Sequence, residues 1–215
     1  MKKLLFVMAN LFVVVFFWGC IGGKSEKAGT AGQSADVSVH DSLPKVWTKI
    51  EATDIKDNPV KLFGQDWLAL AVGNEKEANA MTVGWGGLGT LWQLDNPVVT
   101  VYIRDDRYTR ELLDKNDYFT LTAFPEEHRK ALNYFGTHSG RDTDKMKASG
   151  LIIRFTELGN PLFDEGRLVL ECRQIYNAPF SATGIGTPRG NTPKDGYGER
   201  FIIYIGEIVN VWEKQ

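Results

Sequence analysis

The sequence predicts a mainly β domain that folds as a closed or partly closed barrel with a few short helices. Several segments are rich in Val, Ile, Thr and aromatic residues and are bounded by Gly, Pro, Asn and Asp, as strands usually are. Residues 118–123 alternate cleanly, with Phe119, Leu121 and Ala123 on one side and polar residues on the other. Because the strands are many and the helices few and short, we expect the strands to form the body of the domain.

The N-terminus has the features of an export signal. Lys2 and Lys3 precede an apolar run of 15 residues, which ends at Gly19-Cys20. This run is shorter than the ~20 residues that a membrane-spanning helix needs, and a charged start with a small residue before the cut site is typical of a secretory signal. A Cys directly after the small residue resembles a bacterial lipoprotein signal. We therefore expect cleavage after residue 19, lipidation of Cys20, and export to a bacterial membrane, on the periplasmic or outer-membrane side; an uncleaved anchor is the alternative.

Residues 20–45 are expected to be a flexible tether that follows the lipidated Cys. They contain Gly, Ser, Ala, Lys and Thr but few large apolar residues, so they cannot bury enough surface to offset the entropy of ordering. The globular domain is then 46–215, which is long enough to enclose a real core.

Seven strands and three helices are expected in the domain. The strands are residues 67–72, 81–85, 98–103, 118–124, 151–155, 167–176 and 201–212. One helix should run from about Thr109 to Lys115, a second from Pro125 to Gly136, and a third should follow Ser139 and stop at Gly150. The segment 177–198 is rich in Gly, Pro and Asn and long for a loop, and such loops are often functional or mobile.

Charge and cysteine content exclude some classes of protein. The chain has 25 basic and 27 acidic residues, and two of the basic ones lie in the signal, so nothing indicates a nucleic-acid partner. Beyond Cys20 the only cysteine is Cys172, so an intramolecular disulfide framework is excluded. Cys172 lies on the apolar side of an alternating segment, which favours a buried, inert thiol.

The segment 79–89 combines a hydroxyl, an aromatic plane and several glycines. Trp85 is followed by Gly86-Gly87-Leu88-Gly89. Glycine lets the backbone approach a ligand closely, and an indole can pack against a planar ring. A Trp alone would more simply be a core residue.

Two later segments could bind an anion such as phosphate. Arg104 and Arg107 end a strand and enter a helix, where Thr109 could cap the helix and donate its hydroxyl to the same anion. An ion-pair patch with Asp105 and Asp106 is the alternative.

In the second segment, Ser139 precedes Asp142 by three residues, which is a capping-box pattern. That pattern by itself means only a helix start. A helix N-terminus also attracts phosphate, and Arg141 and Lys145, four residues apart, would lie on one face of that helix.

In this order and spacing, four motifs resemble the flavin reductase-like family. They are Asn-x-Met-Thr-x-x-Trp at 79–85, Arg-x-x-Arg-Tyr-Thr at 104–109, Ser-Gly-Arg-Asp-x-Asp-Lys at 139–145 and Tyr-Ile-Gly-Glu-Ile at 204–208. Two positions depart from the pattern: His138 stands where relatives often carry Lys, and Phe201 where they often carry His.

The resemblance implies an FMN-binding split β-barrel, usually a homodimer with the flavin near the dimer interface. Asn79, Thr82 and Trp85 would lie around the flavin ring and ribityl chain, and Arg104, Thr109, Ser139 and Lys145 at the phosphate end. The full set of residues expected to bind the cofactor is Asn79, Met81, Thr82, Val83, Trp85, Arg104, Arg107, Tyr108, Thr109, His138, Ser139, Arg141 and Lys145.

The chemistry implied by the resemblance is redox chemistry through FMN, with an unknown electron donor and acceptor. The chain would then be a flavin-dependent oxidoreductase tethered to a membrane outside the cytoplasm, where NAD(P)H is scarce. The alternative is a non-catalytic lipoprotein that binds flavin or another planar ligand. The three His residues, His40, His128 and His138, show no metal-ligand spacing, and no Gly-x-Gly-x-x-Gly follows a strand.

Overall fold

The computed structural model describes residue 43 and residues 46–92, 96–180 and 200–214. The expected signal, Cys20 and nearly all of the tether lie outside these residues, as does most of the predicted loop 177–198. The described residues belong to one unit, Ser38–Gln215. None of the helices in the described ranges is long and apolar enough to cross a membrane.

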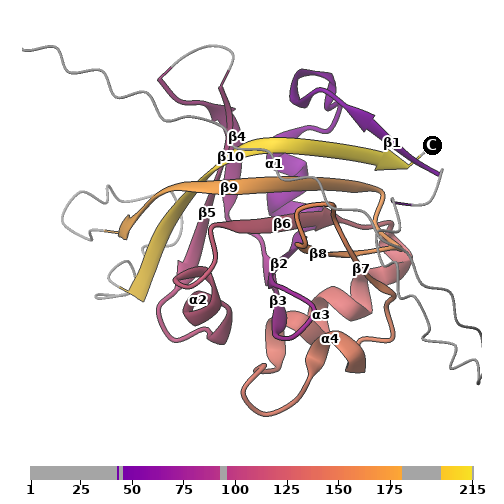
Figure 1. The fold of residues 1–215 in the computed structure, drawn as a ribbon, viewed down its shortest axis with the longest axis vertical. Helices are drawn as coiled ribbons and strands as arrows, with labels where there is room; N and C mark the ends of the chain where they lie inside the picture. The colour runs from indigo at the N-terminus through magenta and orange to yellow at the C-terminus, as the bar shows by residue number, and fades with distance from the viewer. Residues whose placement is uncertain (1–42, 44–45, 93–95, 181–199, 215) are drawn as a thin grey trace, which may run out of the picture. The chain divides into compact units, whose positions relative to one another are not determined.

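Within the described residues, eight strands form one antiparallel sheet (Figure 1). The strand order is β3-β2-β6-β9-β10-β5-β4, and β1 pairs with β10 beside this path. The strands are β1 (Trp47–Ile50), β2 (Leu68–Gly73), β3 (Ala78–Val83), β4 (Gly86–Thr90), β5 (Pro97–Arg104), β6 (Tyr118–Ala123), β9 (Leu168–Pro179) and β10 (Phe201–Lys214). A separate hairpin joins β7 (Ile153–Phe155) to β8 (Pro161–Phe163).

The sheet curls into a split barrel around the main core. Strands β3 and β5 come into contact although they are not neighbours in the hydrogen-bonded order. The enclosed core consists of inward-facing side chains from both halves of the sheet, including Leu70, Val101, Ile103, Phe119 and Leu121. Fully buried Cys172 belongs to this core, as the sequence predicted, and burial raises the pKa of its thiol well above the usual value.

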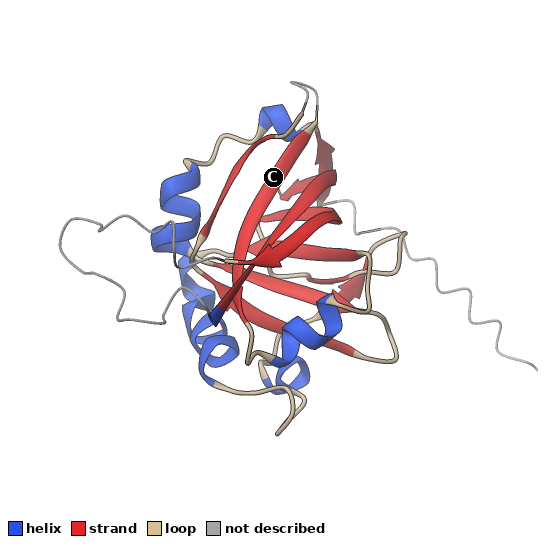
Figure 2. Cartoon of the chain, turned by 90° about the vertical axis from the view of Figure 1, so that its left-hand side faces the viewer, coloured by secondary structure: helices blue, strands red, loops and turns tan. Residues whose placement is uncertain are grey.

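Short helices lie along the outside of the strands (Figure 2). They are η1 (Ala52–Asp54), α1 (Pro59–Lys61), the π-helical η2 (Leu62–Asp66), α2 (Tyr108–Leu113), η3 (Glu126–His128), α3 (Arg129–Thr137) and α4 (Lys145–Ala148). A second core forms where α3 and α4 pack on the outer face of β2 and β3. Its members include Ala71, Ala80, Leu132, Phe135 and Met146.

All seven predicted strands are present, with shifted ends, but three strands were not predicted. They are β1, β4 and β8. The sequence of β4 is Gly-Gly-Leu-Gly-Thr, and glycine disfavours strands because it has no side chain to pack. Strand β8 has only three residues and covers the outer face of β6. For this reason Thr120 and Thr122, which the alternation assigned to the side opposite the core, are fully buried, and the hydroxyl of Thr120 donates to the carbonyl of Pro161.

Two of the three predicted helices are close to their expected bounds, and the third begins later than expected. It starts at Lys145, not directly after Ser139, because Asp144 is the residue whose side chain accepts a hydrogen bond from the Lys147 amide. The predicted end is correct: the chain turns at Gly150, which has a positive φ of 75°. In the second helix, the turn after Pro125 is the 3₁₀ segment η3, and regular α-helix begins at Arg129.

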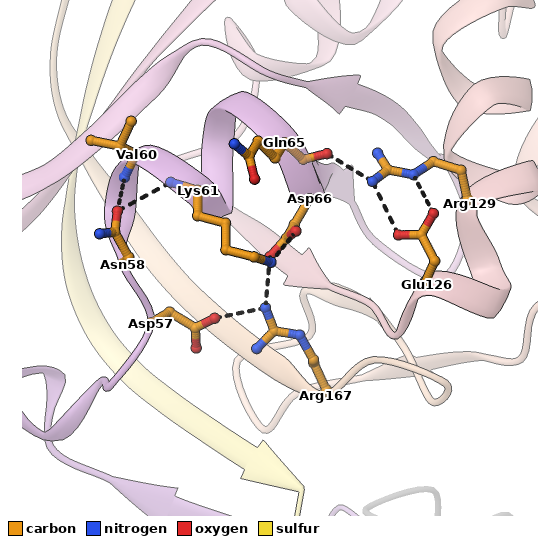
Figure 3. A network of polar contacts seen from close by, with 9 residues as sticks. All are labelled: Asp57, Asn58, Val60, Lys61, Gln65, Asp66, Glu126, Arg129 and Arg167. Atoms are coloured by element: carbon orange, nitrogen blue, oxygen red, sulfur yellow. Dashed lines mark hydrogen bonds and ion pairs between the residues drawn. The ribbon is translucent and has the colours of Figure 1, made fainter.

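An ion-pair network attaches the N-terminal arm, defined here as residues 47–66, to the barrel (Figure 3). Arg167 lies at the start of β9 and contacts Asp57 at 2.7 Å and Asp66 at 3.5 Å. Arg129, at the start of α3, donates to the carbonyl of Gln65 at 2.7 Å. The arm is thereby connected to both the sheet and α3.

Candidate functional site

A pocket of about 200 Å³ lies where the end of β5, the start of α2 and the loop between α3 and α4 meet. The two segments predicted to bind an anion are about 30 residues apart along the chain, and the structure brings them together here. Eight of the predicted residues line the pocket, with Asp106 and Gly140 in addition; the predicted ones are Arg104, Arg107, Tyr108, Thr109, His138, Ser139, Arg141 and Lys145.

Close packing between β3, α2 and the 138–144 loop holds the two segments together. Asn79 on β3 is 2% exposed, and its amide donates to the hydroxyl of Thr109 at 2.8 Å. Thr109 thus contacts β3 through its hydroxyl. It lies within α2, whose N-cap residue is Arg107 and not Thr109. A Cβ at Gly140 would lie 2.3 Å from Oδ1 of Asn79 and 2.7 Å from Cδ1 of Tyr108. Only glycine allows this close approach. The requirement for glycine at position 140, within the Ser-Gly-Arg motif, was not predicted from the sequence.

The inner part of the pocket is formed by two cations at the C-terminal end of α3. Lys145 is 4% exposed, and its ammonium donates to the carbonyls of Phe135 at 2.9 Å and His138 at 3.1 Å. The guanidinium of Arg107 donates to the carbonyl of Gly136 at 3.4 Å. Cations at this end of a helix are favourable because the terminal carbonyls carry partial negative charge.

Neither of these two cations has a carboxylate partner among the described residues. Nε of Arg107 is buried without a hydrogen-bond partner in the described part of the chain. Burial, and to a smaller extent the nearby charge of Arg107, together lower the pKa of Lys145 to about 8. Two neighbouring cations that contact carbonyls but no carboxylate in the described ranges give this part of the pocket a positive charge, which an anion would neutralise.

The arginines at the rim of the pocket, by contrast, are paired with acidic residues. Arg104 and Arg200 both contact the carboxylate of Asp106. Arg141 pairs with Glu111 and donates to the backbone carbonyl of Asp106 at 3.1 Å. The sequence prediction that Arg141 and Lys145 share one helix face is wrong, because Arg141 precedes α4 and lies in the loop.

Ser139 and His138 lie at the mouth of the pocket. Ser139 stands in a turn, where its hydroxyl accepts from the amide of Arg141 at 3.2 Å, so its expected role as a helix cap is wrong. Nδ1 of His138 lies 3.2 Å from the carbonyl of Tyr134, and the two rings stack at 4.0 Å. Nδ1 also lies 3.0 Å from the hydroxyl oxygen of Thr137, so local contacts within α3 hold this ring nitrogen.

The aromatic part of the predicted site lies beside the pocket and does not line it. Trp85 is half exposed and stacks on Phe201, with ring centroids 4.9 Å apart. Phe201 is the strand partner of Arg104 in the β10–β5 pairing, so the Trp85–Phe201 stack adjoins the rim. The hydroxyl of Thr82 donates to the carbonyl of Leu132 in α3.

Met81 and Val83 have side chains in the barrel core. Any contact that these two residues make with a ligand outside the barrel would therefore come from their backbone.

Solved structures of flavin-binding proteins share this fold. A flavoredoxin from Methanosarcina acetivorans is 22% identical, with a TM-score of 0.55 over 77% of each chain. An FMN-binding domain of a flavin reductases-like enzyme from Shewanella baltica is 16% identical, with a TM-score of 0.57 over 81% of this chain and 80% of that chain. An NADH:FAD oxidoreductase from Streptomyces globisporus is 18% identical, with a TM-score of 0.52 over 69% of this chain and 74% of that chain.

No curated protein sequence matches the chain. The flavin reductase like domain family, however, matches residues 67–215, which is more than half of the sequence and includes every residue of the pocket. The chain therefore belongs to the flavin reductase-like family.

Proposed function

We propose that this protein binds FMN, with the phosphate in the pocket between α2 and α4, and transfers electrons or hydride through it. The observation that carries the proposal is the pair of cations Lys145 and Arg107, which lie at one pocket with no carboxylate partner among the described residues. Membership of the flavin reductase-like family supplies the class of ligand.

The residues present fit one phosphate group. A volume of about 200 Å³ is below the range of pockets that enclose whole drug-sized ligands, so the pocket can take only one end of a cofactor. Arg107 and Lys145 would supply the positive charge, and Ser139 and His138 also line the pocket. The ring would lie outside the pocket, toward the Trp85–Phe201 stack.

Bound FMN would accept and return a hydride or two electrons, and the protein would hold and orient it. Asn79 positions Thr109 at the phosphate end, and Gly140 lets the 138–144 loop close over Asn79. Trp85 would limit access of water to one side of the ring.

The absorption spectrum of the protein purified from its native host tests the proposal. A yellow protein whose colour is lost on adding dithionite is expected, and a colourless protein that does not take up added FMN would contradict it. Turnover with NADH or with a reduced electron-transfer partner distinguishes an enzyme from a non-catalytic flavin-binding protein. Phe201, an apolar side chain beside the rim, is the observation that favours the second candidate, because it can neither donate nor accept a proton.

The affinity for FMN should fall as pH rises through about 8. The pKa of Lys145 is lowered to about 8, so the ammonium loses its proton above this pH in the ligand-free protein, and binding of the phosphate dianion then requires proton uptake. We expect a loss of up to about tenfold between pH 7 and pH 9, because the phosphate itself stays dianionic over this range. Fluorescence titration with FMN measures it. Riboflavin affinity should stay level, and Lys145→Met should remove the pH dependence; an equal fall for both ligands would contradict the assignment.

For location, we propose a lipoprotein anchored through Cys20 to a bacterial membrane, outside the cytoplasm. The support is the sequence of residues 1–20, and the electron donor and acceptor would then be partners in that compartment. We also propose the homodimer that the family resemblance implies, which sedimentation would test.

Cys20→Ala should prevent lipidation and leave an unprocessed or unanchored form. The apolar run before Cys20 is too short to span the membrane as a helix, so without lipid the mature domain has no anchor. Membrane fractionation with mass measurement checks this. A Cys20→Ala protein that stays in the membrane at the mass of the wild type, apart from the substitution, would rule out the lipoprotein assignment.

A further inference from the structure

The rim of the phosphate pocket contains one carboxylate that binds two arginines. Oδ2 of Asp106 accepts from Nη2 of Arg200 at 2.8 Å and also from Nη2 of Arg104. Asp106 lines the pocket itself, whereas the neighbouring Asp105 does not. The side chains of all three residues of the Asp106 cluster, defined here as Arg104, Asp106 and Arg200, are about one third to one half exposed.

The charge of the pocket therefore differs between its inner part and its rim. In the inner part, Lys145 and Arg107 have no counter-ion among the described residues, so a single phosphate dianion would balance them. At the rim, Asp106 already occupies both arginines. A second phosphate joined to the first would have to lie on the solvent side, because α3 closes the inner side with its terminal carbonyls. There it would meet the Asp106 carboxylate.

We propose that Asp106 makes this pocket selective for a single terminal phosphate over a diphosphate, and so for FMN over FAD. The inference rests on the proposed function, because it assumes that the flavin phosphate occupies the pocket. Asp106 acts in two ways: its charge repels a second phosphate, and it holds Arg104 and Arg200 away from one. Selectivity between the two flavins is relevant for this fold, because the similar protein from Streptomyces globisporus is an NADH:FAD oxidoreductase.

The test is the ratio of FMN to FAD affinity in Asp106→Asn, measured by fluorescence titration of the purified protein. Asn keeps the size of the side chain, and the backbone carbonyl that accepts from Arg141 is unchanged. FAD affinity should rise about two- to fivefold more than FMN affinity, which is the range expected for charge pairs at partly exposed sites. Asp105→Asn is the control: it removes the same charge one residue away, from a side chain that does not line the pocket and lies 4.0 Å from Nε of Arg200, so it should change the ratio less than Asp106→Asn does.

The variant Arg200→Gln supplies a second, independent measurement. In the Asp106→Asn background it should reduce, but not abolish, the gain in FAD affinity, because Arg200 is one of the two donors released toward the second phosphate. An unchanged ratio in Asp106→Asn, or the same rise for FMN and FAD, would overturn the inference while leaving the proposed function intact. A wild-type protein that binds FMN no better than riboflavin would instead overturn the proposed function and this inference with it.

Discussion

Lys145→Met should weaken FMN binding by about tenfold to a hundredfold and leave riboflavin binding nearly unchanged. Lys145 is buried, and among the described residues the charge that shifts its pKa is Arg107, which is also a cation. A hydrogen bond to a charged group is worth about 1.5–3 kcal/mol, which corresponds to this range of affinities. Isothermal or fluorescence titration with both ligands measures the effect.

A second lysine on the same helix provides the control. Lys147 has an 81% exposed side chain and pairs with Asp144, so Lys147→Met removes the same charge from α4 without reaching the pocket. It should change FMN affinity by less than about twofold. Lys145→Met also leaves the carbonyls of Phe135 and His138 without their donor, so the melting temperature of the ligand-free variant must be recorded. A loss of stability with an unchanged preference for FMN over riboflavin would show that Lys145 serves only to cap α3.

Gly86→Ala should destabilise the barrel by about 1–3 kcal/mol, which lowers the melting temperature by roughly 2–12 °C for a domain of this size. A Cβ at Gly86 would lie 2.4 Å from the backbone oxygen of Thr100 and 2.6 Å from a ring carbon of Phe63. The oxygen belongs to the neighbouring strand β5 and cannot move without disturbing the sheet. Thermal or denaturant unfolding measures the change in free energy.

Gly87→Ala tests whether the effect depends on position. A Cβ at Gly87, the next residue of the same strand, would meet no atom within 4 Å. This substitution should change the free energy of unfolding by less than about 0.5 kcal/mol, as surface substitutions usually do. Equal losses in the two variants would mean that the Gly86 contact is not what limits the residue at this position.

The fold could be predicted largely from strand-like segments, because alternation and β-branched residues report directly on a pleated, buried surface. Strand β4 escaped prediction because glycine disfavours strands, and the close packing that requires Gly86 is against Phe63 and Thr100, which are remote in sequence. The burial of Thr120 and Thr122 also escaped, since alternation identifies two faces but does not tell whether another element, here β8, covers the second.

The sequence predicted which residues form the candidate site more accurately than it predicted how these residues are arranged in space. The motifs at 104–109 and 139–145 do meet in one pocket, yet Ser139 resembles a helix cap only in its spacing from Asp142. Asp144 offers the same local hydrogen bond five residues later and is the cap that forms. The depth of Lys145 and the pairing of Asp106 with Arg200 depend on contacts between distant segments, which spacing along the chain cannot reveal.

The most direct test of the account is a comparison of FMN and riboflavin affinity in the wild-type protein at pH 7. The two ligands share the ring and ribityl chain and differ only in the phosphate, so their ratio isolates the pocket formed by Arg107 and Lys145. We predict that FMN binds at least about tenfold more tightly, because this is the smallest effect expected from the free energy of one charge-assisted hydrogen bond. Equal affinity for the two ligands would contradict the assignment of this pocket to the flavin phosphate.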